Sequence, residues 1–99
     1  MWLGVNGKLP SVKNKNTHLA DAYYYRGTVY VKKGQYDKAI EDYNKAITLD
    51  QNIAATYTGR GFAYFLSGNM GRAISDFQKA CDMGDEGGCK ALQMALKNR

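Results

Sequence analysis

The chain has 99 residues, enough for one small domain with a large share of its surface exposed. No apolar run approaches the roughly 20 residues that span a bilayer, and the first residues lack the pattern of a signal peptide, so we expect a soluble domain. The net charge of +5 comes from the two ends, because residues 20–87 carry eight basic and nine acidic side chains. This distribution argues against nucleic-acid binding, which usually gathers basic residues on one face.

Residues 1–17 are expected to form a flexible arm that precedes a folded domain at 18–99. Glycine, proline and asparagine interrupt every helical or alternating pattern in this segment. Its apolar side chains, which include Trp2 and Leu9, could contact the folded part of the same chain or of a neighbouring one.

The first folded element is predicted to be a helical hairpin. Apolar residues spaced three and four apart indicate a helix that Thr17 caps, that begins at His18 and that ends near Lys33. Gly34 supplies the left-handed residue that ends it. A second helix is predicted from Tyr36 to about residue 49, and small residues let the two antiparallel helices approach closely: Gly27, Ala39 and Ala46.

The same pattern follows again at once, with a period of 34 residues. Repeat one spans 20–53 and repeat two spans 54–87, and Arg26 and Asp42 recur sixteen residues apart as Arg60 and Asp76. We expect an ion pair between the two helices of each hairpin, with two solvated charges as the alternative. A short amphipathic helix at 88–97 is predicted to cap the end of the stack.

The repeated positions are similar to those of the tetratricopeptide repeat (TPR) family. The resemblance rests on Tyr23, Gly27, Tyr30, Ala39, Tyr43 and Ala46, and on their counterparts Tyr57, Gly61, Tyr64, Ala73, Phe77 and Ala80. It implies an all-α fold of about five helices, in which antiparallel helical hairpins stack as a right-handed superhelix. It also implies that the first helix of each hairpin lines a concave groove for a peptide or a partner helix.

The resemblance also gives a set of groove residues. Side chains of these first helices that packing does not use are unusually apolar, and such surfaces commonly mark interaction sites. The groove is expected to contain Tyr24, Thr28, Val31, Thr58, Phe62, Phe65 and Leu66. Coverage of Phe62, Phe65 and Leu66 by the arm or by the last helix is the alternative. The family's paired lysines and asparagines for a chaperone carboxylate are missing, since Tyr24, Thr28 and Gly59 stand in their place.

Cys81 and Cys89 are the only cysteines. Their setting resembles that of secreted, cysteine-rich solenoid proteins, in which such a pair joins neighbouring helices. Within one continuous helix they would lie about 12 Å apart, too far for a disulfide, so bonding requires the break that Gly84, Gly87 and Gly88 can supply. A disulfide and two buried free thiols both remain open. The first fits a periplasmic or secreted protein, the second a cytoplasmic one.

No catalytic constellation, cofactor fingerprint or metal-ligand set is visible, so the chain is not expected to be an enzyme, and neither a cofactor nor a metal is expected. The favoured function is protein–protein interaction through the groove. The alternative is a structural module that forms a dimer or higher oligomer through the same surface, because two repeats fall short of the three that usually make a stable stack.

Overall fold

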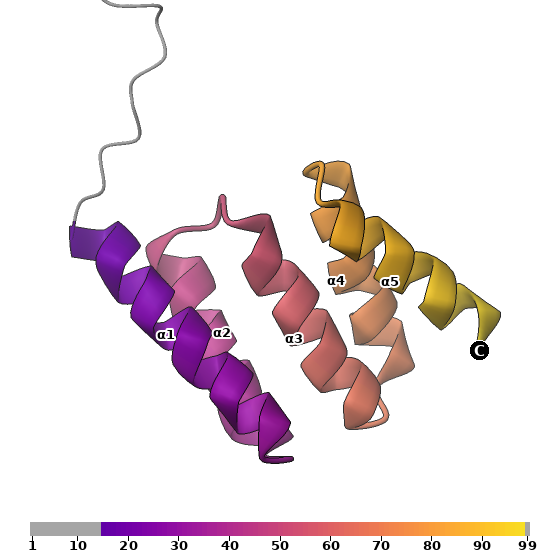
Figure 1. Ribbon diagram of the computed structural model, residues 1–99, viewed down its shortest axis with the longest axis horizontal. Helices are drawn as coiled ribbons and strands as arrows, with labels where there is room; N and C mark the ends of the chain where they lie inside the picture. Colours follow the sequence, from indigo (N-terminus) through magenta and orange to yellow (C-terminus); the bar gives the residue numbers. More distant parts are fainter. Residues whose placement is uncertain (1–14, 99) are drawn as a thin grey trace, which may run out of the picture.

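The computed structural model describes residues 15–98, which form five helices and no strand. The helices follow one another along the stack in Figure 1. Their bounds are α1 (Lys15–Lys32), α2 (Tyr36–Leu49), α3 (Ala54–Leu66), α4 (Met70–Asp82) and α5 (Glu86–Lys97). The expected all-α fold is confirmed.

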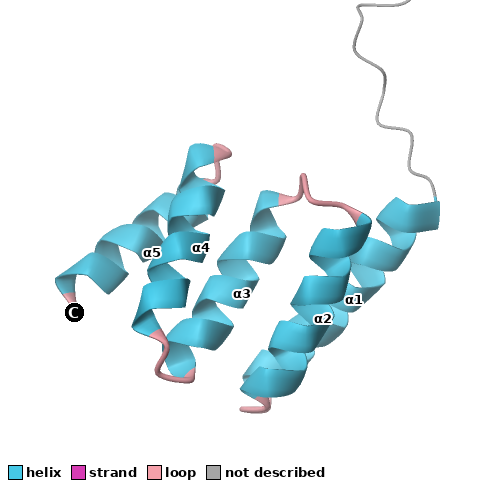
Figure 2. Cartoon of the chain, turned by 180° about the vertical axis from the view of Figure 1, so that it is seen from behind, coloured by secondary structure: helices cyan, strands magenta, loops and turns pink. Residues whose placement is uncertain are grey.

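The helices lie in two layers. In Figures 1 and 2, which view the molecule from opposite sides, α1, α3 and α5 share one layer and α2 and α4 share the other. The pairs α1–α2 and α3–α4 form the two hairpins, and α5 packs against α4 and α3. The first helices of both hairpins therefore lie in one layer, as a groove between them requires.

Three glycines with positive φ end α1, α3 and α4. Gly34, Gly68 and Gly84 have φ of 78°, 93° and 95°, a region that side-chain-bearing residues rarely adopt. In each case the N–H of the following residue donates to a carbonyl five residues earlier, at 2.8–3.0 Å, which satisfies groups left open at a helix end. Gly34 and Gly68 end the first helix of each hairpin and lie one repeat apart, whereas Gly84 uses the same turn at the end of α4.

The core is built from alanines and one large ring per hairpin. Tyr43 packs with Ala39 and Ala63, whereas Phe77 packs with Ala73 and with two alanines of α5. A Cβ on Gly27 would lie 3.0 Å from the Tyr43 ring, and one on Gly61 would lie 2.6 Å from the Phe77 ring. Gly27 and Gly61 therefore leave the space that the rings of Tyr43 and Phe77 occupy.

Both expected ion pairs are present and bidentate. The Arg26 guanidinium donates to Asp42 at 2.7 and 2.9 Å, and that of Arg60 donates to Asp76 at 2.8 Å twice. Both carboxylates are buried, and hydrogen bonding to the carboxylate raises the pKa of each arginine. Arg60 also donates to Asn44 of the preceding hairpin at 2.8 Å, so this position joins the two repeats.

Two expected boundaries were wrong. α1 begins at Lys15, so Thr17 and His18 lie inside the helix and the expected arm shortens. No proline follows Pro10 to prevent this upstream extension. The last helix begins at Glu86, so Gly87 and Gly88 belong to its first turn and Gly84 alone breaks the chain between α4 and α5. The remainder of the arm, residues 1–14, lies outside the described residues.

Within residues 15–98, no helix has the length and apolar character needed to cross a membrane.

Candidate functional site: a groove between α1 and α3

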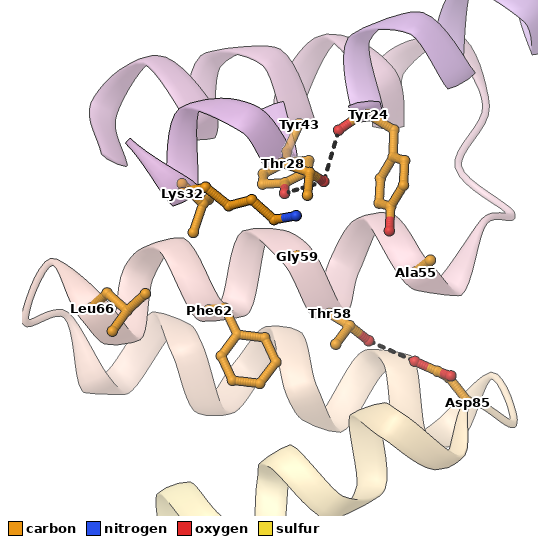
Figure 3. A pocket seen from close by; sticks show the side chains of 11 residues that line it. Tyr24, Thr28, Lys32, Tyr43, Ala55, Thr58, Gly59, Phe62, Leu66 and Asp85 are labelled. Atoms are coloured by element: carbon orange, nitrogen blue, oxygen red, sulfur yellow. Dashed lines mark hydrogen bonds between the residues drawn. The ribbon is translucent and has the colours of Figure 1, made fainter. Parts of the chain in front are cut away.

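A groove of about 420 Å³ runs between the first helices of the two hairpins. Figure 3 shows α1 on one side and α3 on the other, with Tyr43 reaching in from α2 and Asp85 at one end. Its lining is mostly apolar or aromatic: Tyr24, Thr28, Val31, Lys32, Tyr43, Ala55, Thr58, Gly59, Phe62, Leu66 and Asp85.

Two hydroxyl groups form the floor of the groove. The Thr28 hydroxyl donates to the Tyr24 carbonyl at 3.0 Å, and its oxygen lies 2.9 Å from the Tyr43 hydroxyl. Because a threonine hydroxyl has one hydrogen, Tyr43 is the donor of the second bond. Burial raises the pKa of Tyr43. The floor is therefore a neutral, internally satisfied pair that does not require a ligand.

The end of the groove is closed by a bridge between α3 and α5. Asp85 is the N-cap of α5 and accepts the backbone N–H of Gly88 at 3.1 Å. The same carboxylate oxygen accepts the Thr58 hydroxyl at 2.7 Å. A carboxylate at a helix N-terminus is favourable, so Asp85 has a structural role there.

Among residues 15–98, Lys32 is the only cation that lines the groove. Its side chain is exposed, and it has no ion pair or hydrogen bond among the residues that the structure describes. In Figure 3 its ammonium lies in the space between α1 and α3. The groove thus combines an apolar wall, a neutral floor, one unpaired cation and one carboxylate that is already bonded.

Comparison with known proteins identifies the repeats. Residues 20–53 and 54–83 each match a family model described as tetratricopeptide repeat. The chain belongs to the TPR family. No curated protein sequence gives a significant match.

Two solved TPR domains have a similar structure. The second TPR of Spaghetti (RPAP3), bound to the HSP90 peptide SRMEEVD, is 25% identical with a TM-score of 0.78, over 84% of this chain and 79% of that one. The first TPR of the same protein, bound to the same peptide, is 18% identical with a TM-score of 0.51, over 83% and 94%. The second of these likenesses shows the fold alone.

Six of the seven residues expected from the TPR resemblance line this groove, and Phe65 does not. Phe65 instead packs against the cluster of Phe77 and the alanines of α4 and α5. It lies about 60° around the helix from Phe62, toward α4, which explains the difference. Phe62 takes part in both environments, since its ring also contacts Phe77 at a centroid distance of 5.0 Å.

Several groove residues were not on the expected list. The sequence pattern places Tyr43 among the packing positions and does not single out Asp85. Gly59 gave a usable signal, since a glycine inside a predicted helix suggests close approach of another group. The contact is with Tyr43, whose ring carbon Cζ would lie 2.7 Å from a Cβ at this position.

The described residues contain one disulfide and no metal-ligand cluster. Cys81 and Cys89 form a disulfide that joins the end of α4 to the first turn of α5, with Cα atoms 4.5 Å apart. Of the two states left open by the sequence, this structure has the bonded one. No group of three or more histidine, cysteine, aspartate or glutamate side chains in residues 15–98 is placed to hold a metal ion.

Proposed function

We propose that this TPR domain is a protein–protein interaction module that holds a peptide or a partner helix in the groove between α1 and α3. The observation that carries the proposal is the apolar wall formed by Val31, Phe62 and Leu66, of which Leu66 remains half exposed. The similar second TPR of RPAP3 is bound to a peptide, which supports this use of the fold. The proposal gives the chain no reaction of its own.

The lining favours an apolar ligand over a strongly acidic one. A peptide with several carboxylates would find one cation, Lys32, and would be repelled by Asp85 at the other end. A bulky aliphatic or aromatic side chain would instead contact Phe62, Leu66 and Tyr24. We therefore expect ligands with one apolar anchor and at most one or two acidic residues near Lys32.

Selection from a displayed peptide library, followed by affinity measurement, tests this proposal. We expect the selected peptides to share an apolar anchor. They should bind the Leu66→Asp variant about 10- to 100-fold more weakly than the wild type, because burying a leucine is worth about 1.5–3 kcal/mol and a tenfold change in affinity corresponds to about 1.4 kcal/mol. Leu66 is the better position to change, because Phe62 also supports the core.

Leu96→Asp is the matched control, because Leu96 is a similarly exposed leucine on α5 that does not line the groove. Selected peptides should bind this variant as they bind the wild type. The peptide SRMEEVD should bind far more weakly than the selected ones. Equal losses in both variants, or tight binding of SRMEEVD, would contradict the proposed ligand chemistry.

A further inference from the structure

A second apolar surface lies on α1, outside the groove. It consists of Leu19, Ala22, Tyr25 and Val29, which are all exposed, with Tyr25 at 66% and Val29 at 49% of the full residue surface. These residues follow helical spacing and so share one side of α1. We refer to them as the outer face of α1.

The internal repeat shows that the equivalent side of α3 is covered by another helix. A step of 34 residues takes Ala22, Tyr25 and Val29 to positions 56, 59 and 63 of α3, where Thr56 and Ala63 are fully buried. Position 59 contacts Tyr43 and Ala63 packs in the same cluster, so this side of α3 is covered by α2. Among the described residues α1 contacts only α2 and α3, and its outer face has no such cover.

The different exposure of Arg26 and Arg60 also indicates that this side of α1 is uncovered. Arg60 is held by Asn44 of the preceding hairpin, and its side chain is 22% exposed. Arg26, its counterpart, makes the same ion pair within its own hairpin but is 56% exposed. Within residues 15–98, the first repeat therefore lacks the neighbour on this side that the second repeat has.

The same step of 34 residues identifies a candidate for that neighbour in this chain. Taken backward from α2, it leads from Tyr36, Ala39 and Tyr43 to Trp2, Val5 and Leu9, so these three positions are apolar in both segments. We propose that residues 1–14 pack on the outer face of α1 through Trp2, Val5 and Leu9, in the place that α2 takes on α3.

Chain length permits this contact. The outer face extends from Leu19 to Val29, about 15 Å along the helix. Five residues, 10–14, connect Leu9 to the start of α1 at Lys15, and the six Cα–Cα steps span at most about 20 Å when extended. This length allows Leu9 to reach the near end of the face and Trp2 the far end. A short tether gives an effective concentration in the millimolar range, above that of a free partner in most conditions.

The proposal concerns apolar contacts rather than a sixth helix. α1 begins five residues earlier than the repeat would place it, so this contact requires a chain reversal within residues 10–14, a segment that contains Pro10. Gly4 and Gly7 are also poor helix formers.

Trp2 is the only tryptophan of the chain, so its fluorescence reports on this contact directly. In the intact protein we expect Trp2 emission to lie to the blue of that of a synthetic peptide of residues 1–14, with slower quenching by acrylamide. Val29→Asp should shift both properties toward those of the peptide. Leu66→Asp is the matched control, since Leu66 has the same 49% exposure but lies at the groove.

Three results would overturn the proposal. Emission of the wild type at the position of the free peptide would show that residues 1–14 do not pack. A shift caused by Leu66→Asp and not by Val29→Asp would place them in the groove. A blue shift that disappears on dilution would show that a second copy supplies the cover. Circular dichroism checks the fold, and Tyr25→Ser, at the most exposed residue of the face, serves if Val29→Asp unfolds.

Discussion

Tyr43 connects the core of the domain to the floor of its groove. Its ring lies between Gly27 of α1 and Gly59 of α3, and its hydroxyl ends at Thr28. A glycine inside a helix costs about 1 kcal/mol relative to alanine, and at position 59 the space it leaves is filled by this ring. One side chain thus sets the separation of the two helices that line the groove.

The buried hydroxyl of Tyr43 should make stability depend on alkaline pH. Burial raises the pKa of Tyr43, and the hydrogen bond with Thr28 opposes this in part. A tyrosine with a higher pKa in the folded chain adds stability that is fully present below its unfolded pKa of about 10 and is lost as pH rises through the folded pKa. The free energy of unfolding of the wild type should therefore fall more steeply above about pH 10 than that of Tyr43→Phe.

Urea unfolding of both proteins between about pH 7 and pH 11 measures this difference. At pH 7 the Tyr43→Phe variant should be less stable by about 0.5–1.5 kcal/mol, the usual net value of one hydrogen bond. Thr28 keeps its bond to the Tyr24 carbonyl in the variant, so no larger loss is expected. Parallel pH profiles for the two proteins would contradict the assigned burial of the hydroxyl.

At the level of helices, two glycines of the second hairpin should respond in opposite ways to alanine. A Cβ on Gly61 would lie 2.6 Å from the Phe77 ring and 3.3 Å from the Ala73 carbonyl oxygen, whereas one on Gly71 would meet nothing within 4 Å. Overpacking costs about 1–3 kcal/mol, so Gly61→Ala should destabilise the fold despite its higher helix propensity. Gly71→Ala should stabilise α4 by up to about 1 kcal/mol.

Thermal or urea unfolding of the two variants beside the wild type checks this contrast. Both substitutions add the same methyl group within a helix of one hairpin, so each serves as the control for the other. Equal effects would show that helix propensity alone governs these positions and that α3 and α4 do not approach as closely as the structure has them.

The helices and ion pairs could be predicted because the signals are local and occur twice. Spacing places Arg26 and Asp42 on facing sides of a hairpin whichever way the hairpins stack. Phe65 could not be placed in this way, since helical spacing does not say how far around α3 its neighbours α4 and α5 extend. The role of Asp85 was also hidden, because it depends on a bond to Thr58, 27 residues away.

For the whole molecule, two hairpins are fewer than TPR stacks usually need, and the C-terminal end has its own cover. α5 is held by close packing at Gly88, where a Cβ would lie 2.6 Å from that of Ala80, and by the bridge from Asp85 to Thr58. The disulfide between Cys81 and Cys89 adds a covalent link over a separation of eight residues. At the other end of the stack, the outer face of α1 is the surface that would need a similar cover.

Reduction of the disulfide should therefore weaken the whole domain and not α5 alone. Closing a loop of this length is worth about 2–3 kcal/mol in the chain-entropy model, a large fraction of the stability of a small domain. We expect a reductant to lower the urea midpoint of the wild type. The double variant Cys81→Ser, Cys89→Ser should unfold at the lower midpoint with or without reductant. Alkylation of the purified chain without reductant should add no mass, and two added groups would show that the chain folds with free thiols and does not rely on the link.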